Sequence, residues 1–98
     1  MTRAIVLDRR DNVATLIDPG PAGEACALQG EGEGTASLSL LQDIPFGHKV
    51  CVRDTAKGAD VVKYGQVIGK ASAQLRVGEH VHIHNVDSAR GRGDQARG

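Results

Sequence analysis

The stretch Asp60-Val61-Val62-Lys63-Tyr64-Gly65-Gln66-Val67-Ile68-Gly69 indicates the fold class of this chain. Two short runs rich in β-branched residues flank Tyr64-Gly65, and glycine suits the tight turn that would join them. Alternation along the first run puts Val61 and Lys63 on one face and Val62 and Tyr64 on the other. The stretch therefore predicts a strand, a glycine turn and a second strand.

The rest of the chain follows the same pattern. Glycine and proline interrupt it at short intervals, and few of the segments between them reach the roughly 10 residues expected of a helix. The strands that we expect are 3–7, 13–17, 35–41, 48–53, 61–64, 66–68, 74–77 and 80–86. The sequence thus predicts an all-β domain of about eight short strands over residues 1–86. Residues 87–98 have no apolar residue beyond alanine, so we expect a flexible tail.

Composition excludes several kinds of partner. The 98 residues include twelve basic and twelve acidic side chains, one Phe, one Tyr and no Trp. A balanced charge and so few aromatic rings give no reason to expect nucleic acid or an anionic membrane as a partner. No apolar run approaches the roughly 20 residues that span a bilayer, and charges break up residues 1–11, so we expect neither a membrane span nor a signal peptide but a cytoplasmic protein.

The two cysteines, Cys26 and Cys51, lie far apart in the sequence and outside any CxxC spacing. They are expected to be small buried hydrophobic residues in a reducing compartment. A disulfide between them stays open as an alternative.

The segment Glu79-His80-Val81-His82-Ile83-His84-Asn85 is the first that could carry chemistry. On a strand, the three imidazoles would share one face, while Val81 and Ile83 would point into the core. Two neighbouring imidazoles can converge on one metal ion such as Zn, Fe, Mn or Ni, whereas the outer pair is about twice as far apart. The alternative is an exposed polar face of an edge strand.

A second segment, Ile44-Pro45-Phe46-Gly47-His48-Lys49, predicts a tight turn that delivers His48 and Lys49 at the start of a strand. An ammonium group beside an imidazole suits the binding of a carboxylate, because the lysine supplies a charge and the histidine a donor. A solvated strand end is the alternative. In the third segment, residues 60–69, nothing is specific on physical grounds alone.

These segments, in this order, resemble one protein family. The matching motifs are Asp11-Asn12-Val13, Ile44-Pro45-x-Gly47-His48-Lys49-Val50, Gly58-x-Asp60-Val61-Val62-Lys63-Tyr64-Gly65-x-x-Ile68-Gly69-x-Ala71 and Gly78-Glu79-His80-Val81-His82-x-His84-Asn85. The chain resembles, from Ala4 to about Asp94, the small N-terminal domain or separate small subunit of the altronate and galactarate dehydratases. Sulfolactate sulfo-lyase is built on the same plan. The resemblance implies a SAF-type β-clip fold.

The resemblance also implies a chemistry. Family members are hydro-lyases that eliminate water from an aldonate or aldarate, with loss of a proton α to the carboxylate and of the β-hydroxyl, to give a 2-keto-3-deoxy acid. It implies divalent iron or manganese as cofactor, and a large catalytic dehydratase subunit without which this chain is inactive. Residues 87–98 resemble the linker to that subunit.

The site residues expected on this basis fall into three groups. His48 and Lys49 are expected in catalysis, Lys63, Arg90 and Arg92 in substrate binding, and His80, His82 and His84 in metal binding. Arg90 and Arg92 could instead pair with carboxylates on the large subunit. A sulfolactate sulfo-lyase subunit, a stand-alone metal-binding domain and a carrier-type β domain remain as alternatives, and both the sugar acid and homo-oligomer formation stay open.

Overall fold

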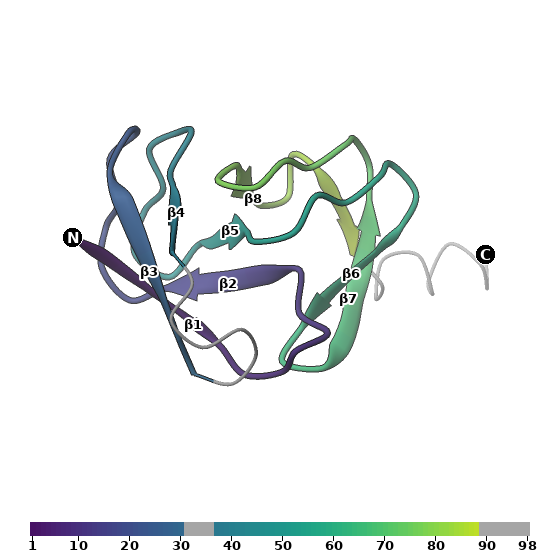
Figure 1. Cartoon of the computed structure of the whole chain (residues 1–98). Helices are drawn as coiled ribbons and strands as arrows, with labels where there is room; N and C mark the ends of the chain where they lie inside the picture. Colours follow the sequence, from purple (N-terminus) through teal and green to yellow (C-terminus); the bar gives the residue numbers. More distant parts are fainter. Residues whose placement is uncertain (31–36, 89–98) are drawn as a thin grey trace.

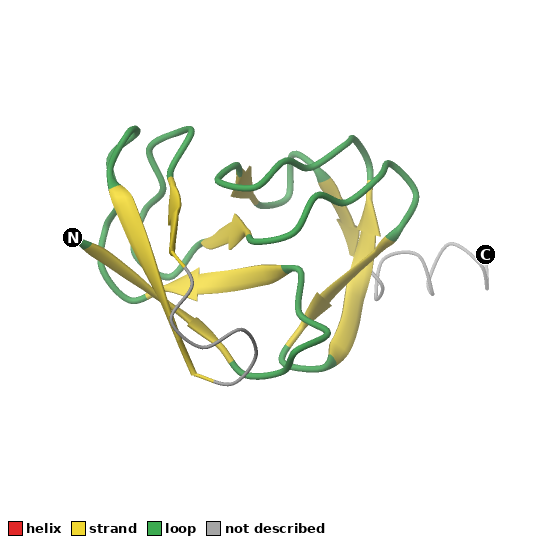
Figure 2. Cartoon of the chain, in the orientation of Figure 1, coloured by secondary structure: helices red, strands yellow, loops and turns green. Residues whose placement is uncertain are grey.

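The computed structural model describes residues 1–30 and 37–88 of the chain, and within them it contains strands, turns and loops but no helix (Figure 2). The all-β class predicted from the sequence is confirmed. The described strands are β1 (Thr2–Val6), β2 (Val13–Leu16), β3 (Ala25–Gly30), β4 (Ser37–Ser39), β5 (Lys49–Cys51), β6 (Asp60–Lys63), β7 (Gln66–Ala71), β8 (His80–Val81) and β9 (Val86–Ser88).

The strands form two sheets. The larger has the order β4-β3-β1-β2-β5-β8, and the smaller has the order β6-β7-β9. All pairs are antiparallel except β1 with β3. Figure 1 shows β1, β3 and β4 at one end of the domain, β6 and β7 at the other, and β2 and β5 running between them.

The central strands β2 and β5 bury both of their faces. On one side, Ala14, Leu16 and Val50 contribute to a first core, and on the other, Val13 and Cys51 contribute to a second. The first core fills the space among β1, β2, β3 and the loop after β4, and the second lies between the two sheets. Two small cores therefore share one wall, which suits a chain with few large side chains.

The hairpin predicted at Tyr64-Gly65 is present. Lys63 pairs with Gln66, so Tyr64 and Gly65 form the whole turn, and their φ angles are both positive, 54° and 78°. Positive φ at both central positions is the mark of a type I′ turn, whose twist matches that of paired strands. Asp11, which is buried, accepts a hydrogen bond of 2.8 Å from the Gly65 amide.

Buried Asn12 attaches this hairpin to the larger sheet. Its side-chain oxygen accepts from the Val62 amide at 2.7 Å, and its Nδ2 donates to Thr55 Oγ1 and to the Asp60 carbonyl. The Asp11-Asn12 pair therefore has a structural role at the junction of the two sheets.

Several expected strand boundaries are wrong. β3 was not predicted; it forms because its backbone lies between β1 and β4. No strand forms over 74–77, where Leu75 makes only an isolated bridge with Thr55. The expected strand 80–86 stops at Val81, and a turn separates it from β9.

The expected tail also begins later than residue 87, because Asp87 and Ser88 belong to β9 and pair with β7. Gly69 permits this pairing, since a Cβ at that position would lie 2.1 Å from the Asp87 carbonyl oxygen. The rest of the expected tail, 89–98, lies outside the described residues, as do residues 31–36.

Cys26 and Cys51 are free thiols, each buried in a different core. The prediction of small buried hydrophobic residues is confirmed, and the disulfide alternative is not realised. Burial is the main cause that raises the pKa of each thiol to about 11. Within the described ranges 1–30 and 37–88, no helix is long and apolar enough to cross a membrane.

Candidate functional site

The turn after β8 is held by the side chain of Asn85, which is only 3% exposed. Its Oδ1 accepts from the His82 amide at 2.9 Å, and its Nδ2 donates to the His80 carbonyl at 2.9 Å. The Asn85 amide in turn donates to the His82 carbonyl at 3.1 Å. An asparagine that captures backbone groups a few residues away competes with a strand ladder, which is why β8 ends at Val81.

This turn overturns the predicted alternation. Val81 is fully buried, as expected, but Ile83 is 84% exposed at the tip of the turn instead of in the core. His80 and His82 are half-buried and His84 is exposed. The three imidazoles therefore do not form one row on a continuous strand.

Pairing of β5 with β8 brings a different histidine to the site. Lys49 pairs with Val81 and Val50 with His80, so the same register continued by one residue places His48 opposite His82. The rings of His48 and His82 are stacked with centroids 4.1 Å apart. Nδ1 of His48 and Nε2 of His80 are 2.9 Å apart, a distance at which one ring nitrogen donates a hydrogen bond to the other.

We call His48, His80 and His82 the histidine cluster. One ring nitrogen from each lies within 4.8 Å of the others, and this is the one such group of potential metal ligands over residues 1–30 and 37–88. His84 is outside it, although its ring centroid is 5.2 Å from that of His80. The structure thus joins a residue expected in catalysis, His48, to two of the three expected metal ligands.

The residues present fit a divalent metal ion. Two nitrogens bound side by side to one ion lie roughly 3–3.4 Å apart when the metal–nitrogen bonds are about 2.0–2.1 Å. The 2.9 Å between His48 Nδ1 and His80 Nε2 is close to that separation. A ring nitrogen of His82 lies within 4.8 Å of the other two, near enough to bind the same ion after a small movement. Neutral imidazole is a ligand for Fe, Mn, Zn and Ni alike, so the donor set does not select among them.

Burial and neighbouring charges favour the neutral form of the cluster. Burial is the first cause that lowers the pKa of His80 and of His82, and repulsion from the other imidazoles and from Lys49 lowers both further. A histidine must be neutral to bind a metal through its ring nitrogen, so these surroundings reduce competition from protons.

Lys49 lies beside the cluster but on the other side of β5. With His82, Ile68, Ile83, Val86 and Ser88 it lines a small pocket of about 180 Å³. Burial, and next the positive charge of Lys63, lower the pKa of Lys49. Lys63 is itself half-buried, with its Nζ 4.9 Å from the centre of the Tyr64 ring. Of the residues expected in catalysis and substrate binding, Lys49 and Lys63 are therefore close enough for the charge of Lys63 to affect the pKa of Lys49.

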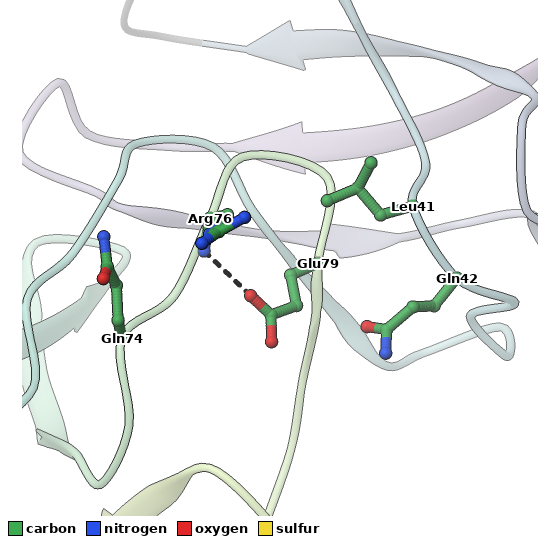
Figure 3. A pocket seen from close by; sticks show the side chains of 5 residues that line it. All are labelled: Leu41, Gln42, Gln74, Arg76 and Glu79. Carbon is green, nitrogen blue, oxygen red and sulfur yellow. Dashed lines mark hydrogen bonds between the residues drawn. The ribbon is translucent and has the colours of Figure 1, made fainter.

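A larger pocket of about 370 Å³ lies next to the cluster, and no histidine lines it. Its lining residues are Leu41, Gln42, Gln74, Arg76 and Glu79. Figure 3 shows the Glu79 carboxylate between the two glutamines, held by the Arg76 amide at 2.9 Å. Gln42 connects the pocket to the cluster, because its Oε1 accepts from the His80 amide at 2.8 Å.

Sequence reasoning missed Asn85 and Gln42 as the residues that hold the cluster. Asn85 stands at the end of the histidine motif, which was the available signal, whereas Gln42 is far away in sequence and gave none. Arg90 and Arg92, expected to bind substrate, lie outside the described residues.

Comparisons with known proteins point to one family. The chain matches the family model described as altronate/galactarate dehydratase SAF domain over residues 2–89. It is 43% identical over 75 residues to altronate dehydratase of Escherichia coli and 33% identical over 85 residues to that of Bacillus subtilis. These matches cover 76% and 87% of this chain but only 14% and 16% of the two relatives.

A further relative has a similar length to the chain. The alpha subunit of (2R)-sulfolactate sulfo-lyase from Chromohalobacter salexigens is 37% identical over 90 residues, which cover 88% of this chain and 94% of that subunit. The all-β fold, the family match and these relatives lead to one assignment. The chain belongs to the altronate/galactarate dehydratase SAF domain family.

Proposed function

We propose that this chain is the small subunit of a hydro-lyase that removes water from a sugar acid, an aldonate or aldarate such as altronate or galactarate, to give a 2-keto-3-deoxy acid. The observation that carries the proposal is the histidine cluster with Lys49 beside it, in a domain of this family. Such an elimination needs a base for the proton α to the carboxylate, a positive group at the carboxylate and help for the departing hydroxyl.

His48, His80 and His82 would hold a divalent ion, Fe²⁺ or Mn²⁺. When bound, such an ion supplies Lewis acidity, which polarises an oxygen of the substrate. Asn85 and Gln42 keep the backbone of His80 and His82 in place, so the ligand nitrogens are held close together before any ion arrives. Lys49 supplies a half-buried positive charge next to the same imidazoles.

The proton acceptor would come from another polypeptide. The group of potential ligands at the cluster consists of three imidazoles and contains no carboxylate among residues 1–30 and 37–88. An ion held by three imidazoles alone keeps coordination positions for substrate, water or a side chain of the large subunit. The isolated chain should therefore fold without showing dehydratase activity.

The test is reconstitution with the large polypeptide that copurifies from the native host. Formation of 2-keto-3-deoxy acid from a panel of sugar acids is measured with Fe²⁺ or Mn²⁺, using wild type, His48→Ala and His84→Ala. His48→Ala should abolish turnover because it removes a cluster ligand, while His84→Ala, outside the cluster, should retain most of it. Turnover by the isolated chain, or equal activity of the two variants, would contradict the proposal.

A second candidate substrate is sulfolactate. It is favoured by the 37% identity of the chain to the sulfo-lyase alpha subunit over 90 residues. The same groups would serve, because a sulfonate group β to the departing proton replaces the hydroxyl as leaving group. Release of sulfite from sulfolactate by the reconstituted complex, without turnover of the sugar acids, would select this candidate.

A further inference from the structure

The core between the two sheets ends in a polar edge. On each of three strands, a polar residue lies two positions from a fully buried core residue: Thr15 after Val13 on β2, Lys49 before Cys51 on β5, and Lys63 after Val61 on β6. Thr15 and Lys49 are direct cross-strand partners, so their side chains lie next to each other on one face of the sheet. We call Thr15, Lys49 and Lys63 the cationic edge.

The two ammonium groups of the cationic edge are not neutralised by the domain. Within residues 1–30 and 37–88, the ion pairs involve the N-terminus, Arg3, Arg10 and Lys70, and neither Lys49 nor Lys63 has a carboxylate at salt-bridge distance. Lys49 and Lys63 are both half-buried. A half-buried positive charge without a counterion is costly, and an anion bound beside it would relieve that cost.

Thr15 adds a second unsatisfied group at the same place. Its Oγ1 is buried and has no hydrogen-bond partner, and within the described chain it is the one buried side-chain polar atom in that condition. Buried hydroxyls normally have a partner. Lys49, the cross-strand neighbour, does not donate to it in this structure, but an ammonium group has three donors, so a change of the Lys49 rotamer would let one donor bond Thr15 Oγ1 while the others point outwards.

The pocket beside Lys49 sets the size of what could bind. Its volume of about 180 Å³ is below that of a typical drug-sized site and equals roughly six water volumes at about 30 Å³ each. Ile68, Ile83 and Val86 make much of its lining apolar, and His82 connects it to the histidine cluster. One end of an organic acid fits this description: the carboxylate meets Lys49, and the adjoining carbons extend towards His82.

We propose that the cationic edge is the carboxylate-binding subsite for the substrate, with Lys49 and Lys63 as the cations and Thr15 as a positioning residue for Lys49. This rests on the proposed function for the identity of the acid. The subsite orients the substrate, because an acid anchored at Lys49 presents its α and β carbons to the side where His82 lies. A carboxylate could also come from an acidic side chain of the large subunit, and the experiment separates the two sources.

The test is titration of the isotope-labelled full chain, followed through its backbone amide resonances. The probes are D-gluconate, an aldonate, and xylitol, a neutral polyol of similar size. Gluconate should shift the amides of Thr15, Lys49 and Lys63 in a saturable way, and xylitol should not. Lys49→Met, which keeps the aliphatic stem, should weaken gluconate binding about tenfold or more, whereas Lys49→Arg should retain most of it.

Lys57→Met is the matched control, because Lys57 is exposed on a turn and does not line the pocket beside Lys49. It should leave gluconate binding unchanged. Should Lys49→Met fail to fold, Lys63→Met removes the other charge of the same edge and is expected to weaken binding in the same direction. Thr15→Val should weaken binding by a smaller factor while Lys49 is still present.

Any of three results with the free chain would overturn the inference. They are the absence of saturable shifts with gluconate, equal shifts with xylitol, and equal weakening by Lys57→Met and Lys49→Met. Unchanged gluconate binding by Lys49→Met combined with weaker association with the large polypeptide would assign the edge to a partner carboxylate and overturn it too. Gluconate binding by the free chain is independent of turnover, so an inactive complex with normal binding would refute the proposed function and leave the subsite in place.

Discussion

Replacement of Asn85 by alanine should damage the histidine cluster through its backbone. The Asn85 side chain makes two hydrogen bonds, one to the amide of His82 and one to the carbonyl of His80. Each is worth about 1 kcal/mol net, and the two backbone groups left without a partner add to the loss, so we expect the free energy of unfolding to fall by about 2–4 kcal/mol. A small domain has roughly 5–15 kcal/mol in total, so Asn85→Ala should still fold.

The more specific effect should be on metal binding. Groups that orient ligands from behind typically change metal affinity by about 10–100-fold when they are removed. We therefore expect Asn85→Ala to weaken binding of Zn²⁺, used as a probe for the three imidazoles, by at least about tenfold in calorimetry. Both the unfolding curve in urea and the metal titration are measured on the full chain.

Asn12→Ala is the matched control for this prediction. Asn12 is also a buried asparagine that binds backbone groups, but its partners are at the junction with β6 and not at the cluster. It should lower the free energy of unfolding by at least as much as Asn85→Ala without weakening Zn²⁺ binding under conditions where the variant is folded. Equal loss of Zn²⁺ affinity in both variants, or no loss in Asn85→Ala, would refute the reasoning.

Three further predictions concern the turn, the thiols and the last strand. Ile83→Ser should change the free energy of unfolding by less than about 0.5 kcal/mol, whereas Val81→Ala should lower it by about 2 kcal/mol. A larger loss from Ile83→Ser, measured by urea unfolding, would show that Ile83 is buried in a continuous strand. Cys26 and Cys51 should react with iodoacetamide near pH 8 far more slowly in the folded chain than in urea, because burial raises both pKa values to about 11; fast modification seen by mass spectrometry in the folded chain would contradict this. Gly69→Ala should displace β9, because the new Cβ would meet the Asp87 carbonyl, and the amides of 86–88 should then lose protection in hydrogen exchange while those of β1 and β2 keep it.

The sequence predicted the fold class well because that prediction depends on local features. Glycine and proline breaks limit segment length, and the Tyr64-Gly65 turn is fixed by two residues alone. Strand boundaries depended on distant partners. β3 contains alanines that favour strands weakly, and it forms because β1 and β4 complete its hydrogen bonds on both sides.

The candidate site was predictable in its residue types but not in its grouping. His80 and His82 were identified from their spacing, whereas the membership of His48 depends on the register of β5 with β8, which no local pattern specifies. The exclusion of His84 depends on Asn85, whose side chain takes the His82 amide away from strand pairing. The sequence alone cannot show whether the His82 amide pairs with a neighbouring strand or with the Asn85 side chain, because both arrangements are compatible with the same residues.

The pairing of β5 with β8 also determines when the histidine cluster can form during folding and synthesis. His48 and the other two cluster residues are separated by more than thirty positions, and the residue that orders the turn, Asn85, comes later still. Contacts between such distant segments form late in folding, since the entropy of closing the intervening loop must be overcome first. During synthesis, a ribosome-bound chain that has exposed residues 1–79 has one of the three imidazoles and no cluster. Capture of a metal ion by all three would therefore mark a chain in which β8 has already joined β5 in the larger sheet.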